Sequence, residues 1–310
     1  MDRPRRSNTG FVRLFALLLC LNVPLLTKAW WDPGHMVTAQ IAYQNLDKSV
    51  RQKADDLIDV LKKAYPYTSN FVEASCWPDD LKSEGVHLYD TWHYTNIPYN
   101  PDGVALPPKP EVDVIWAIGK CGSILSSTKT RPIEKARALA FMIHFVGDIH
   151  QPLHSTTMYS NELPGGNRGG NHFDIDESHG NLHKLWDDGC GYLSHLNDIR
   201  PYRAVKEANT SDEMKRLKEM AKKIIKAHPE KKMPEAAQLD PKFWAMESHN
   251  LAVKYAYRGF NGMKGERKTF LSPGGKPSPE YIAKGQEIVA ERVALGGYRL
   301  ARLLNQLLGE

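Results

Sequence analysis

Long apolar stretches are almost absent from this chain of 310 residues. The first apolar run covers residues 15–26 and is too short to span a membrane comfortably. It also contains Pro24, which disfavours a continuous helix there. No later stretch approaches the roughly 20 apolar residues that a spanning helix requires. We therefore expect no membrane span once the first residues are removed.

Cysteine is also rare, with four in the chain. One of them, Cys20, lies in the N-terminal apolar run. The other three, Cys76, Cys121 and Cys190, permit at most one intramolecular disulfide and leave one thiol over. We predict one disulfide, and the spacing leaves its pairing open.

An excess of positive charge is missing from most of the chain, although the formal net charge is +5. Residues 1–29 hold five basic residues and one acidic residue, so the remainder is close to neutral and the charge says little about substrate. The Arg-rich beginning, the apolar run and the small residues Thr27 and Ala29 are typical of a secretory signal. We predict cleavage after Ala29, which makes Trp30 the N-terminus of a secreted protein. An uncleaved anchor or a buried first helix is the alternative.

Regular alternation of apolar and polar residues is scarce, and apolar residues recur instead at helical spacing. The segments with helical spacing are residues 35–46, 49–63, 111–127, 132–150, 212–227, 239–257 and 280–308. Residues 86–97 and 172–175 are the only candidates for short strands. The Gly-rich residues 161–171 lack the Gly-Lys-Ser/Thr ending of a phosphate-binding loop and predict a surface loop or hairpin. With no repeat or linker, residues 30–310 are predicted to form a single mainly α domain with at most a small β element.

A pair of potential metal ligands lies inside the helix predicted for residues 132–150. His144 and Asp148 are four residues apart and share one face, and His154 follows just after Pro152 interrupts the helix. An isolated pair with this spacing is usually a hydrogen bond on a helix surface. Here the neighbours are apolar, and burying the Asp148 carboxylate among them is costly unless a cation compensates its charge.

The same spacing recurs at His183 and Asp187, and two such pairs are harder to attribute to chance. Asp79, after a Trp-Pro pair, and His93, between Trp and Tyr, are further candidates. Imidazole and carboxylate ligands without thiolate suit zinc in catalytic use, where a position stays open for water or substrate.

These candidates fall in motifs that follow one another along the chain. The motifs are Trp30 with His35, Trp77-Pro-Asp79, Trp92-His93-Tyr94, His144-Phe-Val-Gly-Asp148, Gln151-Pro-Leu-His154, Asn181-Leu-His183 and Trp186-Asp187. Together they resemble the class I zinc nucleases, which include fungal single-strand-specific nucleases, plant bifunctional nucleases and trypanosomatid 3′-nucleotidase/nucleases. The resemblance covers nearly the whole chain from Trp30 onward.

The resemblance implies a phospholipase C/nuclease-like fold with three zinc ions in a cleft. By matching positions, the first zinc would be held by Asp79, His93, His144 and Asp148, and the second by His154, His183 and Asp187. The third would be held by His35, Asp148 and the α-amino group and backbone oxygen of Trp30. Asp148 would thus bridge two ions, and the third site would require signal cleavage because the α-amino group exists only afterwards.

The activity implied is hydrolysis of single-stranded RNA and DNA to 5′-phosphate products, together with removal of 3′-phosphate from 3′-nucleotides. Asp79 and Asp148 would be catalytic through the zinc ions, because paired zinc ions bring the pKa of a bound water close to neutrality. Lys82 matches a position near the phosphate, with a solvated helix lysine as the alternative. Tyr94 matches a position that stacks on a base, with core packing as the alternative, and Asn96 matches a position at the base edge.

The remaining histidines have a structural or surface interpretation, with His150 the least certain because it lies between ligands. Asn209 begins an Asn-Thr-Ser glycosylation sequon. Two other functions compete with the nuclease. One is a zinc phospholipase C on the same scaffold, and the other is a non-catalytic secreted protein with structural zinc. No stable protein partner is expected.

Overall fold

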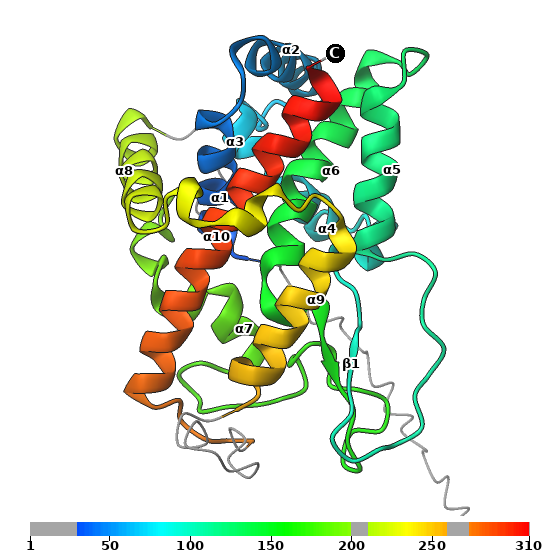
Figure 1. Cartoon of the computed structure of the whole chain (residues 1–310), viewed down its shortest axis with the longest axis vertical. Helices are drawn as coiled ribbons and strands as arrows, with labels where there is room; N and C mark the ends of the chain where they lie inside the picture. Colours follow the sequence, from blue (N-terminus) through cyan, green and yellow to red (C-terminus); the bar gives the residue numbers. More distant parts are fainter. Residues whose placement is uncertain (1–29, 200–209, 259–272, 310) are drawn as a thin grey trace, which may run out of the picture.

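The computed structural model describes residues 30–199, 210–258 and 273–309. The predicted signal at residues 1–29 and the predicted glycosylation site Asn209 lie outside the described residues. Helices dominate the rest, which confirms the mainly α prediction (Figure 1). The long helices are α1 (Asp32–Gln44), α2 (Lys48–Ala64), α5 (Val114–Ser126), α6 (Pro132–His150), α8 (Ser211–Ala227), α9 (Pro241–Leu251) and α10 (Pro279–Leu308). The short ones are α3 (Phe71–Ala74), α4 (Trp77–Ser83) and α7 (Leu182–Asp187).

The prediction of a strand at residues 86–97 is wrong. That segment consists of turns and the 3₁₀ helix η1 (Asp90–His93). Its apolar side chains pack on helices and do not form a ladder, since the Trp92 ring lies 5.7 Å from that of Phe141 in α6. The described β structure is two parallel strands of two residues each, β1 (Pro98–Tyr99) and β2 (Thr157–Met158). Residues 172–175 contribute only an isolated bridge from Asp174 to Asn181.

Helix α6 lies at the centre of the fold, with α2, α5, α9 and α10 around it (Figure 1). Pro132 occupies its first turn, and the helix ends at His150, before the second proline. Every residue from 138 to 150 is buried. A helix that is buried on all sides forms the core of a domain, so polar side chains on α6 need partners inside the protein.

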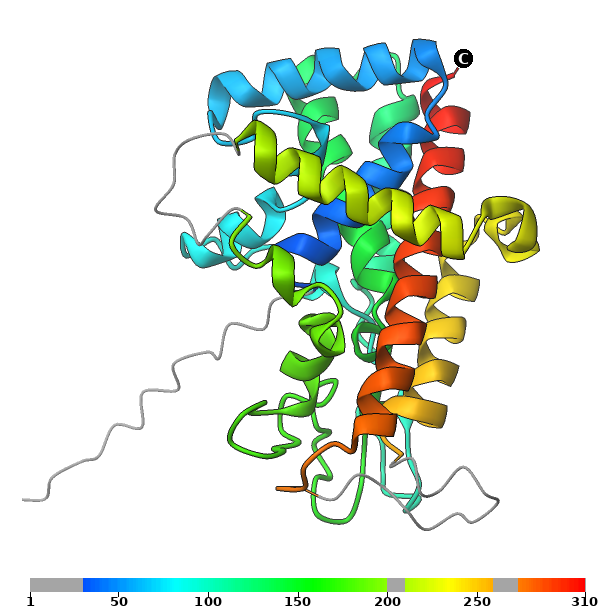
Figure 2. The same ribbon diagram turned by 90° about the vertical axis from the view of Figure 1, so that its left-hand side faces the viewer.

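Helix α8 covers α1 on the side shown in Figure 2, and α10 runs past both. The apolar residues Leu217, Met220 and Ile224 of α8 join a hydrophobic cluster that includes Trp30. The first described residue is therefore part of the core, and its side chain is completely buried.

The prediction of a disulfide among Cys76, Cys121 and Cys190 is wrong. Each of these cysteines is buried in a different hydrophobic cluster, so no disulfide joins any two of them. Within the described residues, no helix combines the length and the apolar composition that crossing a bilayer would need.

Candidate metal centre

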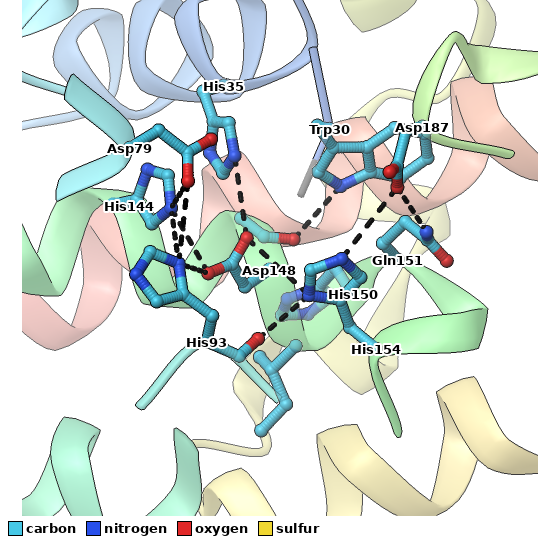
Figure 3. A network of polar contacts seen from close by, with 12 residues as sticks. Trp30, His35, Asp79, His93, His144, Asp148, His150, Gln151, His154 and Asp187 are labelled. Atoms are coloured by element: carbon cyan, nitrogen blue, oxygen red, sulfur yellow. Dashed lines mark hydrogen bonds and ion pairs between the residues drawn. The ribbon is translucent and has the colours of Figure 1, made fainter. Parts of the chain in front are cut away.

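The predicted histidine and aspartate ligands come together around Asp148 of α6 (Figure 3). Three groups have ligand atoms within 4.8 Å of one another: His35, Asp79 and His144; His93, His144 and Asp148; and His154, His183 and Asp187. All eight side chains are buried. They come from α1, α4, η1, α6, α7 and the 3₁₀ helix η2 (Pro152–Ser155), so only the folded chain assembles them.

The two oxygens of the Asp148 carboxylate face different histidines. Oδ1 lies 3.4 Å from His35 Nε2 and 3.8 Å from His154 Nδ1. Oδ2 lies 3.0 Å from His93 Nδ1 and 3.2 Å from His144 Nε2. This arrangement agrees with the bridging position that the sequence resemblance gave to Asp148.

The other two aspartates complete the arrangement. Asp79 Oδ1 lies 3.8 Å from both His93 Nδ1 and His144 Nε2. Asp187 reaches His183 Nε2 at 3.3 Å through Oδ2. Tetrahedral zinc with bonds of about 2.0 Å holds its ligand atoms roughly 3.3 Å apart, so these separations fit zinc with small movements of the side chains.

Backbone carbonyl groups orient three of the histidine rings. The Nδ1–H groups of His144, His154 and His183 donate to Ser75 O at 2.6 Å, His93 O at 2.8 Å and Gly169 O at 2.7 Å. A carbonyl can only accept, so in the neutral form of each ring Nε2 carries the lone pair and can serve as a ligand. Hydrogen bonds from the ring nitrogen that does not bind the metal fix the tautomer of metal-binding histidines.

Several polar atoms at the centre are buried and make no hydrogen bond to any described residue. They are His35 Nδ1 and Nε2, Asp148 Oδ1, His154 Nε2 and His183 Nε2. Buried polar atoms in native proteins are almost always satisfied, and an ion is one of the partners that can satisfy them. The donor set therefore fits zinc ions bound among these atoms.

The electrostatics of the centre also favour the binding of a cation. Burial, with the charge of His144 adding to it, lowers the pKa of His35 to about 3 and keeps that ring neutral. Burial opposes ionisation of Asp148, but the charge and hydrogen bond of His144 outweigh it and hold the pKa of Asp148 well below its usual range. Burial likewise lowers the pKa of His144, but the carboxylates of Asp148 and Asp79 raise it overall to about 9. Two ionised carboxylates are thus buried together, and a bound cation or protonated imidazole must balance them.

Two glycines leave room for Trp30 and His35, with Gly34 of α1 next to Trp30 and Gly147 of α6 next to His35. The Trp30 indole donates from Nε1 to Gly147 O at 3.0 Å. A Cβ at Gly34 would lie 2.7 Å from Trp30 Cβ, and one at Gly147 would lie 2.8 Å from His35 Nδ1. Only glycine fits at these two positions. Close packing therefore explains why the motif has glycine at position 147, directly before Asp148.

A prediction follows for Gly147→Ala. Alanine inside a helix is normally favoured over glycine by about 1 kcal/mol. Here the new methyl group meets the His35 ring, which cannot retreat because it stacks on His144 with centroids 3.8 Å apart. We expect the variant to lose about one zinc equivalent per chain and to melt at a lower temperature than the parent, measured by metal analysis and thermal unfolding.

The matched control is Gly119→Ala in α5, where a Cβ would contact nothing within 4 Å. That variant should be at least as stable as the parent and retain its metal. A stabilised Gly147→Ala protein with full metal content would show that His35 is not held as described.

A cleft of about 1390 Å³ opens onto the candidate centre. His93, His154 and His183 are among the residues that line it. The cleft therefore extends to the edge of the centre, an opening that a closed structural zinc site lacks.

The three predicted substrate residues also line this cleft. Lys82 is only 8% exposed, so the interpretation as a solvated helix lysine is wrong. Burial raises the pKa of Asp79, but the charges of His144, His93 and Lys82 lower it overall, which indicates that the ammonium lies near the centre. Tyr94 is partly buried at the cleft wall and outside the core. Asn96 accepts a hydrogen bond from Thr157 Oγ1 through Oδ1 at 2.6 Å.

Other cleft residues were not singled out by the sequence. Trp116 of α5 and Lys242 of α9 also line the cleft, and Arg168 and Asn171 come from the Gly-rich residues 161–171. The prediction of a surface loop there is incomplete, because residues 166, 167, 169 and 170 are buried. Arg168 is the one basic residue in that stretch, a signal that could have drawn attention to it.

His150 does not belong to the candidate centre. Its Nδ1–H donates to Val146 O at 2.7 Å, and its Nε2 accepts from Arg299 Nη1 at 3.0 Å. The structural interpretation of this histidine is confirmed. None of the other described histidines outside the motifs joins the three ligand groups.

Comparisons with known proteins agree on one family. A family model described as S1/P1 Nuclease matches residues 30–309. Endonuclease 3 of Arabidopsis thaliana is 29% identical over 296 residues, covering 90% of this chain and 88% of that protein. Endonuclease 1 of the same plant is 28% identical over 331 residues, covering 98% and 95%. Nuclease S1 of Aspergillus oryzae (strain ATCC 42149 / RIB 40) is 26% identical over 174 residues, covering 52% and 54%.

Proposed function

The chain belongs to the S1/P1 nuclease family, and from that premise we propose that it is a secreted, zinc-dependent enzyme. In this proposal it cleaves single-stranded RNA and DNA and removes 3′-phosphate from nucleotides. The observation that carries the proposal is the set of buried histidines and aspartates around Asp148, which opens onto a cleft lined by Lys82 and Tyr94. Secretion is supported by the Arg-rich and apolar character of residues 1–29.

Three zinc ions would be held by the side chains that the fold brings together. Asp79, His93, His144 and Asp148 would hold the first, His154, His183 and Asp187 the second, and His35, Asp148 and the terminal amine of Trp30 the third. When bound, the ions supply a water activated near neutral pH and positive charge next to phosphate oxygens.

The chain itself supplies the charge and the surfaces that position a nucleotide. Lys82 is nearly buried beside Asp79, so its ammonium can bind a phosphate oxygen with little competition from solvent. The ring of Tyr94 offers a face for stacking, and a base can stack there only when it is unpaired, which selects single strands. The Asn96 oxygen is occupied by Thr157, so its amide nitrogen is the group left to donate to a base edge.

Two observations favour this function over the alternatives. A non-catalytic zinc protein would enclose its ions, whereas three candidate ligands here line an open cleft. The relatives described above are named as endonucleases or nucleases, which favours a nuclease over a phospholipase C.

The direct test combines metal analysis with three assays on the protein that begins at Trp30. We expect three zinc equivalents per chain, release of phosphate from 3′-AMP, and cleavage of single-stranded DNA well ahead of the duplex. Hydrolysis of phosphatidylcholine without nucleotide release would favour the phospholipase, and zinc without any hydrolysis would favour the structural alternative.

Tyr94→Ala tests the stacking surface. Stacking on an aromatic side chain contributes about 1–3 kcal/mol per base, so we expect kcat/KM on single-stranded DNA to fall by roughly 10- to 100-fold. Tyr94→Phe keeps the ring and should stay within a few-fold of the parent. Equal losses in the two variants would mean that the hydroxyl group, and not the ring face, is what the substrate uses.

A further inference from the structure

Arg168 has an unusual backbone conformation beside the candidate centre. Its φ angle is +51°, in the left-handed region that a residue with a Cβ rarely adopts. Gly169 and Gly170 continue in the same region with φ angles of +62° and +90°. Residues held in this way are found mainly where the surrounding structure fixes them and where function uses the placement.

The neighbours of Arg168 fix its backbone on both sides. Asn167 is completely buried, and its Oδ1 accepts from Met158 N at 3.0 Å and Gly170 N at 3.1 Å. Gly169 O accepts from His183 Nδ1 at 2.7 Å, and a Cβ at Gly169 would lie 2.5 Å from Leu153 O. The loop is thus anchored to a predicted zinc ligand, and Arg168 cannot relax without disturbing it.

The side chain of Arg168, by contrast, is exposed and lines the cleft. Among the described residues no carboxylate forms an ion pair with it. Tyr94 lines the same cleft. The loop that carries Arg168 packs against Thr157, since a Cβ at Gly166 would lie 2.6 Å from its methyl group, and the Thr157 hydroxyl donates to Asn96. A strained, unpaired cation next to a stacking surface is suited to an anionic ligand.

Lys82 and Arg168 serve different parts of the cleft. Lys82 follows the predicted zinc ligand Asp79 by three residues in α4, whereas the loop of Arg168 packs on Thr157, the hydrogen-bond partner of Asn96. Lys82 therefore lies where the reacting phosphate would be, and Arg168 lies beside the base. The nearest other phosphate on that side of a nucleotide is its own 5′-phosphate.

We propose that Arg168 forms a second phosphate subsite, which binds the 5′-phosphate of the nucleotide whose base stacks on Tyr94. A guanidinium can hold two phosphate oxygens at once, which makes arginine well suited to this role. The subsite gives the enzyme a preference for internal nucleotides of a strand over free 3′-nucleotides. This inference rests on the proposed function of the same cleft.

The test compares 3′-AMP with adenosine 3′,5′-bisphosphate, following release of the 3′-phosphate. We expect the parent to favour the bisphosphate by at least about 10-fold in kcat/KM, the size of one hydrogen bond to a charged group. Arg168→Gly should lose most of that preference, and Arg168→Lys should keep part of it. Lys184→Ala, which removes an exposed charge outside the cleft, is the control and should keep the preference in full.

Glycine is chosen because it accepts a positive φ, so the variant is expected to fold and to melt about 2 °C higher than the parent. A purely structural role for Arg168 predicts no change in substrate preference. The inference is overturned if the parent does not favour the bisphosphate, or if Arg168→Gly favours it as strongly as the parent.

Binding of 5′-AMP and of adenosine to the zinc-loaded proteins, measured by calorimetry, separates this inference from the proposed function. The parent should bind 5′-AMP more tightly than adenosine, and Arg168→Gly should lose at least about 10-fold of that difference. An unchanged difference would contradict the subsite even in an active enzyme. Absence of hydrolysis by the parent would contradict the proposed function, while the binding comparison still decides the role of Arg168.

Discussion

Asp148→Asn is expected to lower the rate of phosphate release from 3′-AMP by about 10³-fold, which corresponds to roughly 4 kcal/mol of transition-state stabilisation. The bound zinc should fall from three equivalents to about one. The amide has the shape of the carboxylate, so a loss of this size would come from charge and ligand strength and not from packing.

The expectation of one remaining zinc follows from how the groups are divided. Asp148 lies within reach of His35, His93 and His144, which belong to two of the three groups. The group of His154, His183 and Asp187 contains its own carboxylate and is oriented independently, because His183 is held by Gly169 O. Removing the Asp148 charge therefore weakens the sites proposed for the first and third ions and leaves the second, at His154, His183 and Asp187, able to bind.

Asp188→Asn is the matched control for this variant. Asp188 follows a predicted ligand directly, but its carboxylate accepts from Ser194 and Asn197 and belongs to none of the three groups. The control should keep its zinc and its activity. If Asp148→Asn kept the parental rate with three zinc ions bound, the carboxylate would not be a bridging ligand and the centre would need a different assignment.

The parts of the molecule that could be predicted from sequence depend on local patterns. Helix α6 has a proline near each end, which predicted its residue range. The spacing of its two ligands places them on one face, which predicted its role. The motifs around it made the family recognisable, and the match over residues 30–309 confirms that resemblance.

The predictions that were wrong depended on contacts distant in the sequence. The alternation in residues 86–97 suggested a strand, but the Trp92 ring packs on Phe141 of α6, and the parallel strand pairing begins only at Pro98. The disulfide failed because Cys76, Cys121 and Cys190 are separated into three clusters, a fact that spacing along the chain does not contain.

The position of Arg168 in the cleft is another feature that the local sequence could not predict. Glycines on either side predicted turns at residues 161–171. Whether such a loop faces solvent or an active site depends on its partners, here Asn167 buried beneath it and the ring of His183 beside it. These contacts form only when the loop meets α7, which the local sequence cannot specify.

Keeping Ala29 in front of Trp30 is expected to remove about one zinc equivalent and to lower activity by roughly 100-fold or more. The structure gives a reason for so large an effect from one added residue. The Trp30 side chain is completely buried, and its indole N–H donates a hydrogen bond to Gly147 O. The backbone N–H of Trp31 donates to Asp187 O at 3.0 Å. The backbone of Trp30 is thereby fixed between two segments that carry predicted ligands.

Because the Trp30 side chain is buried and hydrogen-bonded to α6, we expect cleavage to change the chemistry of this residue more than its position. A peptide nitrogen has no lone pair to offer a metal, whereas a free amine can bind one after losing its proton. The decisive comparison uses a protein with a removable N-terminal extension, with zinc content and 3′-AMP hydrolysis measured before and after its removal. Gain of one zinc together with activity would make signal cleavage the activating step, and a fully active extended protein with three zinc ions would exclude the terminal amine as a ligand.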